Sequence, residues 1–258
     1  MAIDEHEIPE PPWTRRRRPR AAARAPLSRE AIVEATLRVV DAEGLDAASM
    51  RRVADELGTA PSALYWHVRG KDELLQLALD RVIGEVRLPP SDPTRWEEQL
   101  RTFAREARRV FARHRDIARV SLGSIPVGPN ALRTMEWAHG LLRDAGLPDR
   151  VVALVGDLFG LYIGAYAYEE SLGLASPTGE DLPPQEVVAL LRDYWGSLPP
   201  ERFPHTLALL PQLFEGGPDE RFEFGLDVLV RGIASLAAET DGNGAKGRRS
   251  VRRSAKRG

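Results

Sequence analysis

Side chains suited to contact a nucleic acid gather in one short stretch of the chain. Ser62 and Ala63 are small enough to allow a close approach, while Tyr65, Trp66 and His67 can donate hydrogen bonds or stack. Those are the properties that a face reading a DNA groove needs. The stretch therefore indicates a DNA-binding surface, and the alternative is a pair of ordinary packed helices with the Tyr and Trp rings in the core.

Two short helices on either side of a turn must position these side chains. The first helix is expected to begin at Ser49, whose hydroxyl can cap free backbone N–H groups. Gly58 suits the turn because it takes a positive φ without steric cost, and Pro61 suits the first turn of the second helix. The residues expected to face the core are Met50, Val53, Leu57, Leu64 and Val68. This is the anatomy of a helix-turn-helix, whose second helix enters the major groove.

Composition limits the classes of protein to consider. The chain has 258 residues and no cysteine, which excludes a disulfide framework and a thiolate metal site. Its formal net charge of −2 argues against a protein that coats nucleic acid with its entire surface. We expect no membrane-spanning helix, and the acidic start does not resemble an export signal. A cytoplasmic protein with no membrane partner is the expectation.

Charge and proline divide the chain into parts. Arginines cluster at 15–24 and basic residues cluster again at 246–257, so the middle is acidic. Proline-rich LPPSDP separates two helical regions. The expected order is a disordered basic arm at 1–26, a helix-turn-helix domain at 27–87, a larger domain at 93–240 and a disordered basic tail at 241–258. The arm either lies along DNA or is simply solvated.

Helical periodicity continues to the end of the chain, and no segment alternates as a strand does, so we expect an all-α fold. The helix at 151–168 is apolar nearly all round and is predicted to be the buried centre of the larger domain. Its glycines, Gly156, Gly160 and Gly164, permit close helix approach. The other predicted helices are 28–42, 71–86, 96–110, 116–122, 131–145, 185–195, 206–213 and 222–238.

Three segments resemble one family. LYWHV at 64–68, with Lys71 after it and EGLDAASM before the helix-turn-helix, resembles the DNA-binding domain of TetR-type repressors. RDIARVSLGSIP at 115–126 and FEFGLDVLVRGI at 222–233 resemble the regulatory domain of the tetracycline-repressor branch. The resemblance implies an N-terminal three-helix helix-turn-helix domain and a larger helical domain for ligand binding and dimerisation.

The resemblance also assigns DNA contacts. Arg51 is placed to reach a guanine edge or, alternatively, to clamp a phosphate, and Ser62 and Ala63 approach bases. Tyr65, Trp66, His67 and Lys71 grip phosphates and position the domain. The full expected set is Arg51, Arg52, Thr59, Ala60, Ser62, Ala63, Tyr65, Trp66, His67 and Lys71. Because long base-reading donors are few, Arg51, the arm and DNA shape are expected to carry much of the specificity.

An effector site is expected in the larger domain, where aromatic rings and a few hydroxyls can line an apolar pocket or, alternatively, form a core. Ser121, Ile125 and Arg87 stand where the resemblance places a histidine, an arginine and a histidine of the tetracycline repressors. We therefore expect an apolar or aromatic effector rather than tetracycline with magnesium, and no metal or cofactor. The expected ligand residues are Phe103, Ser121, Ser124, Met135, His139, Phe159, Tyr162 and Tyr166.

A homodimer is expected because two recognition helices roughly 34 Å apart match a palindromic operator. The expected interface residues are Leu190, Tyr194, Phe222, Leu226, Leu229 and Ile233, although the last four also fit an intrachain core helix. The predicted function is a repressor that a small inducer releases from its operator. The alternatives are a ligand-free adaptor and an all-α enzyme, but the chain has no nucleophile motif, metal-spaced histidine pair or phosphate loop.

Overall fold

The computed structural model describes residues 27–114, 116–123, 125, 127–173, 179 and 182–254, with side chains described up to residue 238. The predicted arm at 1–26 and the predicted ligand residue Ser124 lie outside the described residues. Every regular element within the described ranges is helical, which confirms the predicted all-α class.

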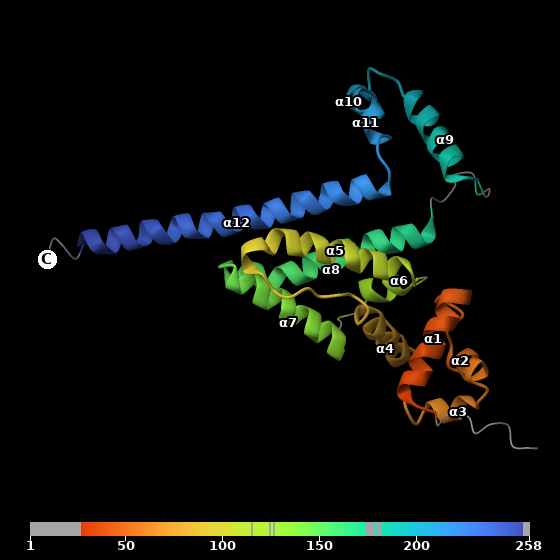
Figure 1. Cartoon of the computed structure of the whole chain (residues 1–258). Helices are drawn as coiled ribbons and strands as arrows, with labels where there is room; N and C mark the ends of the chain where they lie inside the picture. Colours follow the sequence, from red (N-terminus) through yellow and green to blue (C-terminus); the bar gives the residue numbers. More distant parts are fainter. Residues whose placement is uncertain are drawn as a thin grey trace, which may run out of the picture.

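The helices follow one another with short connections (Figure 1). They are α1 Arg29–Glu43, α2 Met50–Leu57, α3 Pro61–Leu64, α4 Lys71–Ile83, the 3-10 helix η2 Pro93–Arg95, α5 Trp96–Ala112, α6 Ile117–Leu122, α7 Pro129–Asp144, α8 Asp149–Leu172, α9 Pro184–Gly196, α10 Pro204–Ala208, α11 Leu210–Leu213 and α12 Pro218–Ser254. Helices α1 to α3 form a small unit at one end, and α4 connects it to the larger bundle (Figure 1).

Local capping chemistry explains how the small unit starts and turns. The Ser28 hydroxyl caps α1 by accepting a hydrogen bond from the Ala31 N–H at 3.1 Å, and Ser49 caps α2 in the same way. Gly58 ends α2 in the left-handed conformation, with φ 61°, and Pro61 begins α3. The predicted cap at Ser49, turn at Gly58 and helix start at Pro61 are therefore confirmed.

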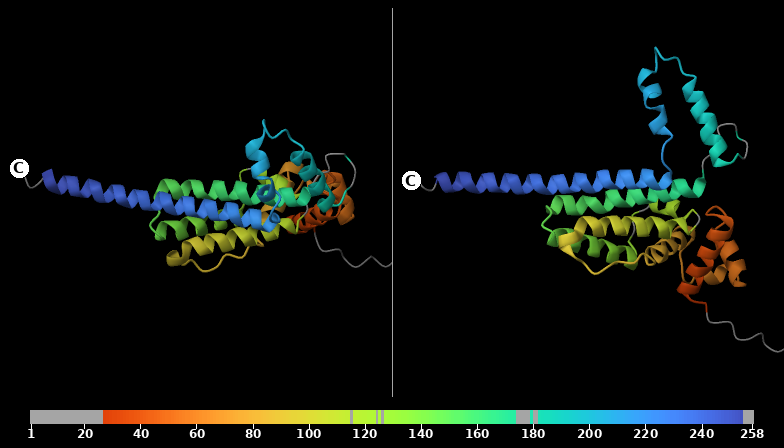
Figure 2. Two further views of the ribbon diagram at one scale, coloured as in Figure 1. Left: turned by 90° about the horizontal axis from the view of Figure 1, so that it is seen from above. Right: turned by 45° about the horizontal axis from the view of Figure 1, so that its top comes forward.

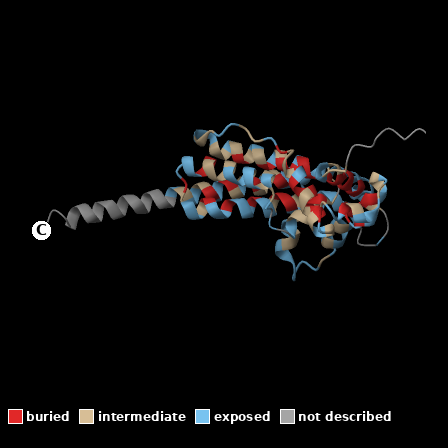
Figure 3. Ribbon diagram, turned by 90° about the horizontal axis from the view of Figure 1, so that it is seen from below, coloured by how far each residue is buried: buried red, intermediate tan, exposed pale blue. Residues whose placement is uncertain are grey.

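The larger domain has its own core between α5, α6, α7, α8 and α12. Its largest fully buried side chains include Ile117, Leu141, Leu142 and Phe222. Buried residues gather where these helices face one another, while their outer faces are exposed (Figure 3). The two cores meet beside α4, whose Leu74 belongs to the small unit and whose Val82 belongs to the larger one.

Several predicted helix ends differ from the structure, and the helix expected at 206–213 is divided into α10 and α11. The connecting helix was expected to reach Val86 but ends at Ile83, because Gly84 takes the C-cap position. Helix α12 runs to Ser254, through the boundary at 240–241 where a disordered tail was expected. Only residues 255–258 of the expected tail lie outside the described ranges.

Helix α8 corrects two expectations. Its 24 residues include a stretch with mean hydropathy 1.6, so by length and composition alone it is long and apolar enough to cross a membrane. It was also expected to be the buried centre of the larger domain, but only a third of that stretch is buried. One face packs on α5 and α6, whereas Leu154, Leu158 and Leu161 on another face are exposed. Helix α8 thus covers the core with one side and presents an apolar row with the other.

The expected dimer residues fall into two groups. Phe222, Leu226 and Ile233 are buried in the core of their own chain, and half-buried Leu229 packs against it, which favours the alternative of an intrachain core helix for this row. Helix α12 carries apolar residues on more than one face, and the periodicity did not reveal which row is turned inward. Leu190 and Tyr194 are exposed on α9, which projects with α10 and α11 from the bundle (Figures 1 and 2).

Candidate nucleic-acid and effector sites

The turn formed by α3 and the residues after it exposes two aromatic rings. The relative exposure of Trp66 is 89% and that of Tyr65 is 57%, while Leu64 and Val68 in the same turn are buried. The Val68 N–H donates to the Leu64 carbonyl at 3.0 Å, so helical geometry continues past the end of α3. This arrangement excludes the alternative in which the Tyr and Trp rings fill a core.

The remaining predicted DNA-contact residues surround this turn. Ser62, Ala60 and Arg51 are exposed, and Thr59, Ala63, His67 and Lys71 are half-buried. They belong to α2, to the turn between α2 and α3, to α3, to the turn that follows α3, or to the first residue of α4. The fold therefore brings the predicted set together on one end of the molecule, away from the larger bundle (Figure 1).

The two adjacent arginines of α2 differ in their surroundings. The Arg52 guanidinium donates to Glu43 at 2.6 Å and to Glu56 at 3.2 Å, and the bond to Glu43 raises the pKa of Arg52 above its ordinary value. Arg51 has no ion-pair partner in the described part of the chain. Arg52 is thus held along the domain surface, and Arg51 is the arginine of α2 that is available to a ligand.

The predicted effector residues are distributed over four helices. Phe103 of α5 and Trp137 of α7 lie with their ring centroids 5.5 Å apart, both at the edge of the core. Phe159 is buried inside that core, and Met135 and His139 are partly exposed on α7. The structure thus leaves Phe103, Met135 and His139 accessible and places Phe159 among packing residues.

Three predicted hydroxyls already have protein partners. The Ser121 hydroxyl donates to the Ala118 carbonyl at 2.7 Å. It also lies so close to α8 that a Cβ on Gly164 would come within 2.9 Å of the Ser121 Oγ. The hydroxyls of Tyr162 and Tyr166 donate to carbonyls at the start of α12, at 2.6 and 3.3 Å. Burial raises the pKa of Tyr162 above its ordinary range. These tyrosines therefore join α8 to α12 in this structure.

Arg108 completes that junction. Its guanidinium contacts Glu170 near the end of α8 and donates to Asp219 in the first turn of α12 at 2.8 Å. It also lies 4.6 Å from the centroid of the Phe222 ring. Burial acts to lower the pKa of Arg108, but the bonds and charges of both carboxylates outweigh burial and raise it. Arg108 thus joins the end of α8 to the start of α12, and α9 to α11 project between these two points.

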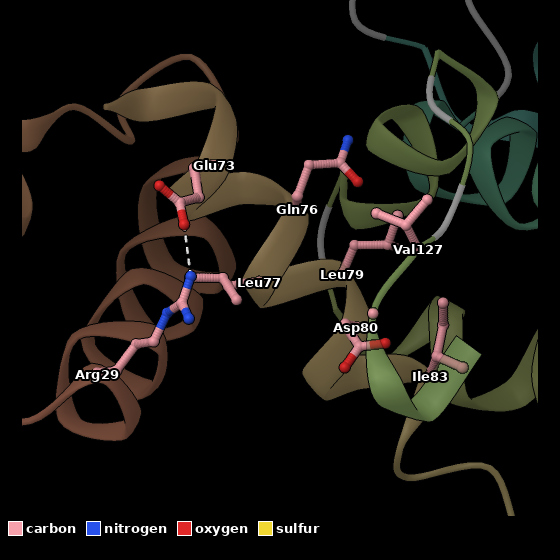
Figure 4. A pocket seen from close by; sticks show the side chains of 9 residues that line it. Arg29, Glu73, Gln76, Leu77, Leu79, Asp80, Ile83 and Val127 are labelled. Atoms are coloured by element: carbon pink, nitrogen blue, oxygen red, sulfur yellow. Dashed lines mark hydrogen bonds and ion pairs between the residues drawn. The ribbon is translucent and has the colours of Figure 1, made fainter. Parts of the chain in front are cut away.

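A cavity of about 240 Å³ lies between the two domains, and none of the predicted effector residues line it (Figure 4). It is bounded by α1, α4 and the segment before α7, with the Arg29–Glu73 ion pair on one side and Asp80, Ile83 and Val127 on the other. Among the described residues, no three His, Asp or Glu side chains are grouped as a metal site.

Sequence reasoning missed the residues that join the domains. Asp80 of α4 accepts hydrogen bonds from the start of α7, and His114 lies between Asp41 of α1 and Glu85 after α4. Asp80 lies outside the apolar row of the connecting helix, and its burial is visible only in the fold. The partners of these residues lie 29 to 73 positions away, which periodicity does not report.

Comparison with known proteins agrees with this architecture. Residues 32–78 match the family model for bacterial regulatory proteins of the tetR family, and residues 88–237 match the tetracyclin repressor-like C-terminal domain. The HTH-type transcriptional repressor DrrR1 of Streptomyces coeruleorubidus is 34% identical, over 90% of this chain and 87% of that protein. The class C tetracycline repressor protein of Escherichia coli is 29% identical, over 83% and 94%.

Solved structures give the same result. Apo ActR from Streptomyces coelicolor has a TM-score of 0.77 and 40% identity, covering 84% of this chain and all of that one. ActR in complex with actinorhodin has a TM-score of 0.76 and 41% identity, covering 84% and 99%. These relatives are transcription regulators and not enzymes, and they include ligand-bound forms. The chain belongs to the TetR family of bacterial transcriptional regulators.

Proposed function

We propose that this regulator is a repressor that binds a palindromic operator as a homodimer and is released by a small organic effector. The observation that carries the proposal is the exposed ring of Trp66, held outward by the burial of Leu64 and Val68 in the same turn. Exposed large rings on a soluble domain mark an interaction surface, and a helix-turn-helix presents this turn to the major groove. We further propose that the protein acts in the cytoplasm.

Within this surface we assign separate tasks to the two arginines of α2. Arg51 is exposed and reaches a base edge or a phosphate, whereas Arg52 positions α2 through Glu43 and Glu56. Ser62 and Ala63 stand at the start of α3, where short side chains approach the groove floor. Specificity then rests on few base contacts, supplemented by the shape of the DNA.

For the homodimer, the partner is a second copy of this chain, seated on the outer faces of α8 and α12. Both helices expose apolar residues along one row, namely Leu154, Leu158 and Leu161 on α8 and Phe224 and Val228 on α12. The two helices pack together, so these rows lie on neighbouring elements. A Cβ on Gly156 or Gly160 would meet nothing within 4 Å, which leaves room for another helix to approach α8 closely.

The projecting α9 extends this interface in the proposal, with Leu190 and Tyr194 contacting the second copy. The dimer is tested with Leu158→Glu and Phe224→Glu, measured by sedimentation velocity. Both variants are expected to be monomers and to lose about 100-fold or more in DNA affinity, because two half-sites no longer bind together. The matched control is Leu132→Glu, an equally exposed leucine on α7, which should remain a dimer. Dimers of both interface variants would contradict the proposed face.

For the effector, we propose a small organic molecule bound within the larger domain against Phe103, Met135 and His139. Support comes from ActR, which has been solved with actinorhodin and with (S)-DNPA. Actinorhodin serves as the first probe, with binding followed by calorimetry and by release of DNA. Binding that Phe103→Ala weakens supports this site, whereas binding that depends on neither Phe103 nor Met135 contradicts it.

DNA binding itself is tested by selecting duplexes from a random pool with the wild-type protein. The selected sequences should share a palindrome. Arg51→Ala and Trp66→Ala should each weaken binding to it by about 1–3 kcal/mol, and replacement of Arg109, which is exposed on α5, by alanine should not. Equal binding of selected and random DNA by all these proteins would contradict the assignment of α3 as the reading helix.

A further inference from the structure

The carboxylate of Asp80 caps a helix of the other domain. Asp80 lies on α4 and is buried, with only 8% of its surface exposed. One carboxylate oxygen accepts a hydrogen bond from the Ala131 N–H at 3.0 Å. The other accepts bonds from the backbone N–H and the side-chain amide of Asn130, at 3.3 and 3.1 Å. The connecting helix thus supplies the N-terminal cap of α7.

The sequence at the start of α7 explains why a distant cap is needed. Gly128 occupies the N-cap position and has no side chain, and Pro129 after it has no N–H to satisfy. The next two N–H groups, those of Asn130 and Ala131, are the ones that Asp80 accepts. A Cβ at Gly128 would overlap the Asp80 carboxylate, so no residue with a capping side chain fits at position 128. Helix α7 therefore depends on α4 for its cap.

Helix α4 is also tied to the DNA-binding domain, next to the same residue. Arg81 donates to Glu34 of α1 at 2.7 Å, and Glu73 pairs with Arg29 of α1 about two turns earlier. The cavity described above lies between these α1 contacts and Asp80 (Figure 4). Adjacent residues of α4 thus connect it to both domains beside this pocket.

We propose that Asp80 is the coupling residue through which the regulatory domain and the DNA-binding domain sense each other. This inference rests on the proposed function as an effector-controlled DNA binder. If the start of α7 is displaced, either α4 moves with it or the hydrogen bonds to the buried Asp80 carboxylate break. The contact between α4 and α7 thus has two states, capped and uncapped. In this proposal the capped state is the one that binds DNA. Because coupling between two sites is reciprocal, DNA bound at α3 stabilises the cap at α7.

This reciprocity allows a test that needs no effector. Hydrogen exchange of the peptide spanning 128–135 is compared with and without the duplex selected by the wild-type protein. DNA is expected to slow exchange of this peptide by about fivefold or more in the wild type, and by less than about twofold in Asp80→Ala. Asp80→Asn keeps the shape of the side chain and serves if the alanine variant does not fold. Asp144→Asn, at the exposed far end of α7, is the matched control and should behave as the wild type.

The two hypotheses fail in different ways. If Asp80→Ala and Asp80→Asn bind the duplex and retain the full slowing, Asp80 does not couple the domains and the inference is overturned. If the wild-type protein selects and binds no duplex, the proposed function is overturned and the coupling with it. Loss of the slowing with duplex affinity kept within about threefold supports the inference, because binding and coupling are then separated.

Discussion

The carboxylate of Asp116 accepts a hydrogen bond from the backbone N–H of Leu45 at 3.1 Å. Leu45 follows α1 in the DNA-binding domain, and Asp116 stands at the N-terminus of α6 in the larger domain. Asp116 also has a φ of 58°, a left-handed conformation that aspartate and asparagine tolerate better than most residues. Its identity is therefore constrained by its backbone and by its contact across the domain boundary.

Replacing Asp116 by alanine should lower the free energy of unfolding by about 2–4 kcal/mol. The N–H of Leu45, which loses its acceptor, accounts for about 1–3 kcal/mol of this loss. The strain of alanine in the left-handed conformation accounts for the rest. Asp116→Asn retains an acceptor and tolerates the conformation, so it should lose less than about 1 kcal/mol. Urea unfolding measures both variants, and equal losses would contradict this explanation.

Arg108→Ala should destabilise the larger domain by about 2 kcal/mol or more, since it leaves the partly buried Glu170 without its partner. Arg108→Lys should restore only part of this, because an ammonium cannot reproduce the fork that reaches both Glu170 and Asp219. Thermal unfolding reports the effect. Arg109→Ala, which removes an exposed pair with Glu106 on the same helix, should change stability by less than about 0.5 kcal/mol.

Gly225 allows α12 to approach α8. A Cβ at this position would lie 2.5 Å from the hydroxyl of Tyr162, which donates to the Phe222 carbonyl. Gly225→Ala should therefore destabilise the protein by about 1–3 kcal/mol, despite the better helix propensity of alanine. Gly140→Ala in α7 meets nothing within 4 Å and should be neutral or stabilising. Destabilisation of equal size in both variants would show that the tight contact is not the cause.

Glu223 should give stability a pH dependence. Its bond with Arg105, at 2.6 Å, lowers the pKa of Glu223 below its ordinary value of 4.5. The pair therefore stabilises the fold fully above pH 4.5, the unfolded-state value, and the contribution disappears as pH falls through the lower folded-state value. Because both side chains are about half exposed, the contribution is below about 1 kcal/mol. The stability difference between wild type and Glu223→Gln should thus be larger at pH 7 than at pH 3, and a difference independent of pH would contradict it.

Features set by local chemistry were predictable from the sequence. The cap at Ser49, the left-handed turn at Gly58 and the helix start at Pro61 each depend on neighbours within a few residues. The burial of Leu64 and Val68 beside an exposed Trp66 also follows from helical spacing. The buried and exposed sides of this turn were therefore predicted correctly, although α4 ends three residues earlier than its apolar stripe suggested.

Features set by distant partners were not predictable. Helix α12 has one apolar row through Phe222 and another through Phe224, and periodicity alone cannot tell which one meets α8. The roles of Asp80 and Arg108 come from residues 50 to 111 positions away. Aromatic composition likewise does not distinguish the packing role of Phe159 from an accessible ring such as Phe103. Assigning an interface or a pocket required the arrangement of the helices.

Hydroxyl-radical footprinting of the selected duplex, combined with the mass of the complex in solution, tests the central claim most directly. The account predicts two protected half-sites whose centres lie about one helical turn, roughly 34 Å, or a multiple of that apart, bound by two copies of the chain. It also predicts that Trp66→Ala weakens the protection of both half-sites together. A single protected site bound by one copy, or protection that does not depend on Trp66, would contradict it.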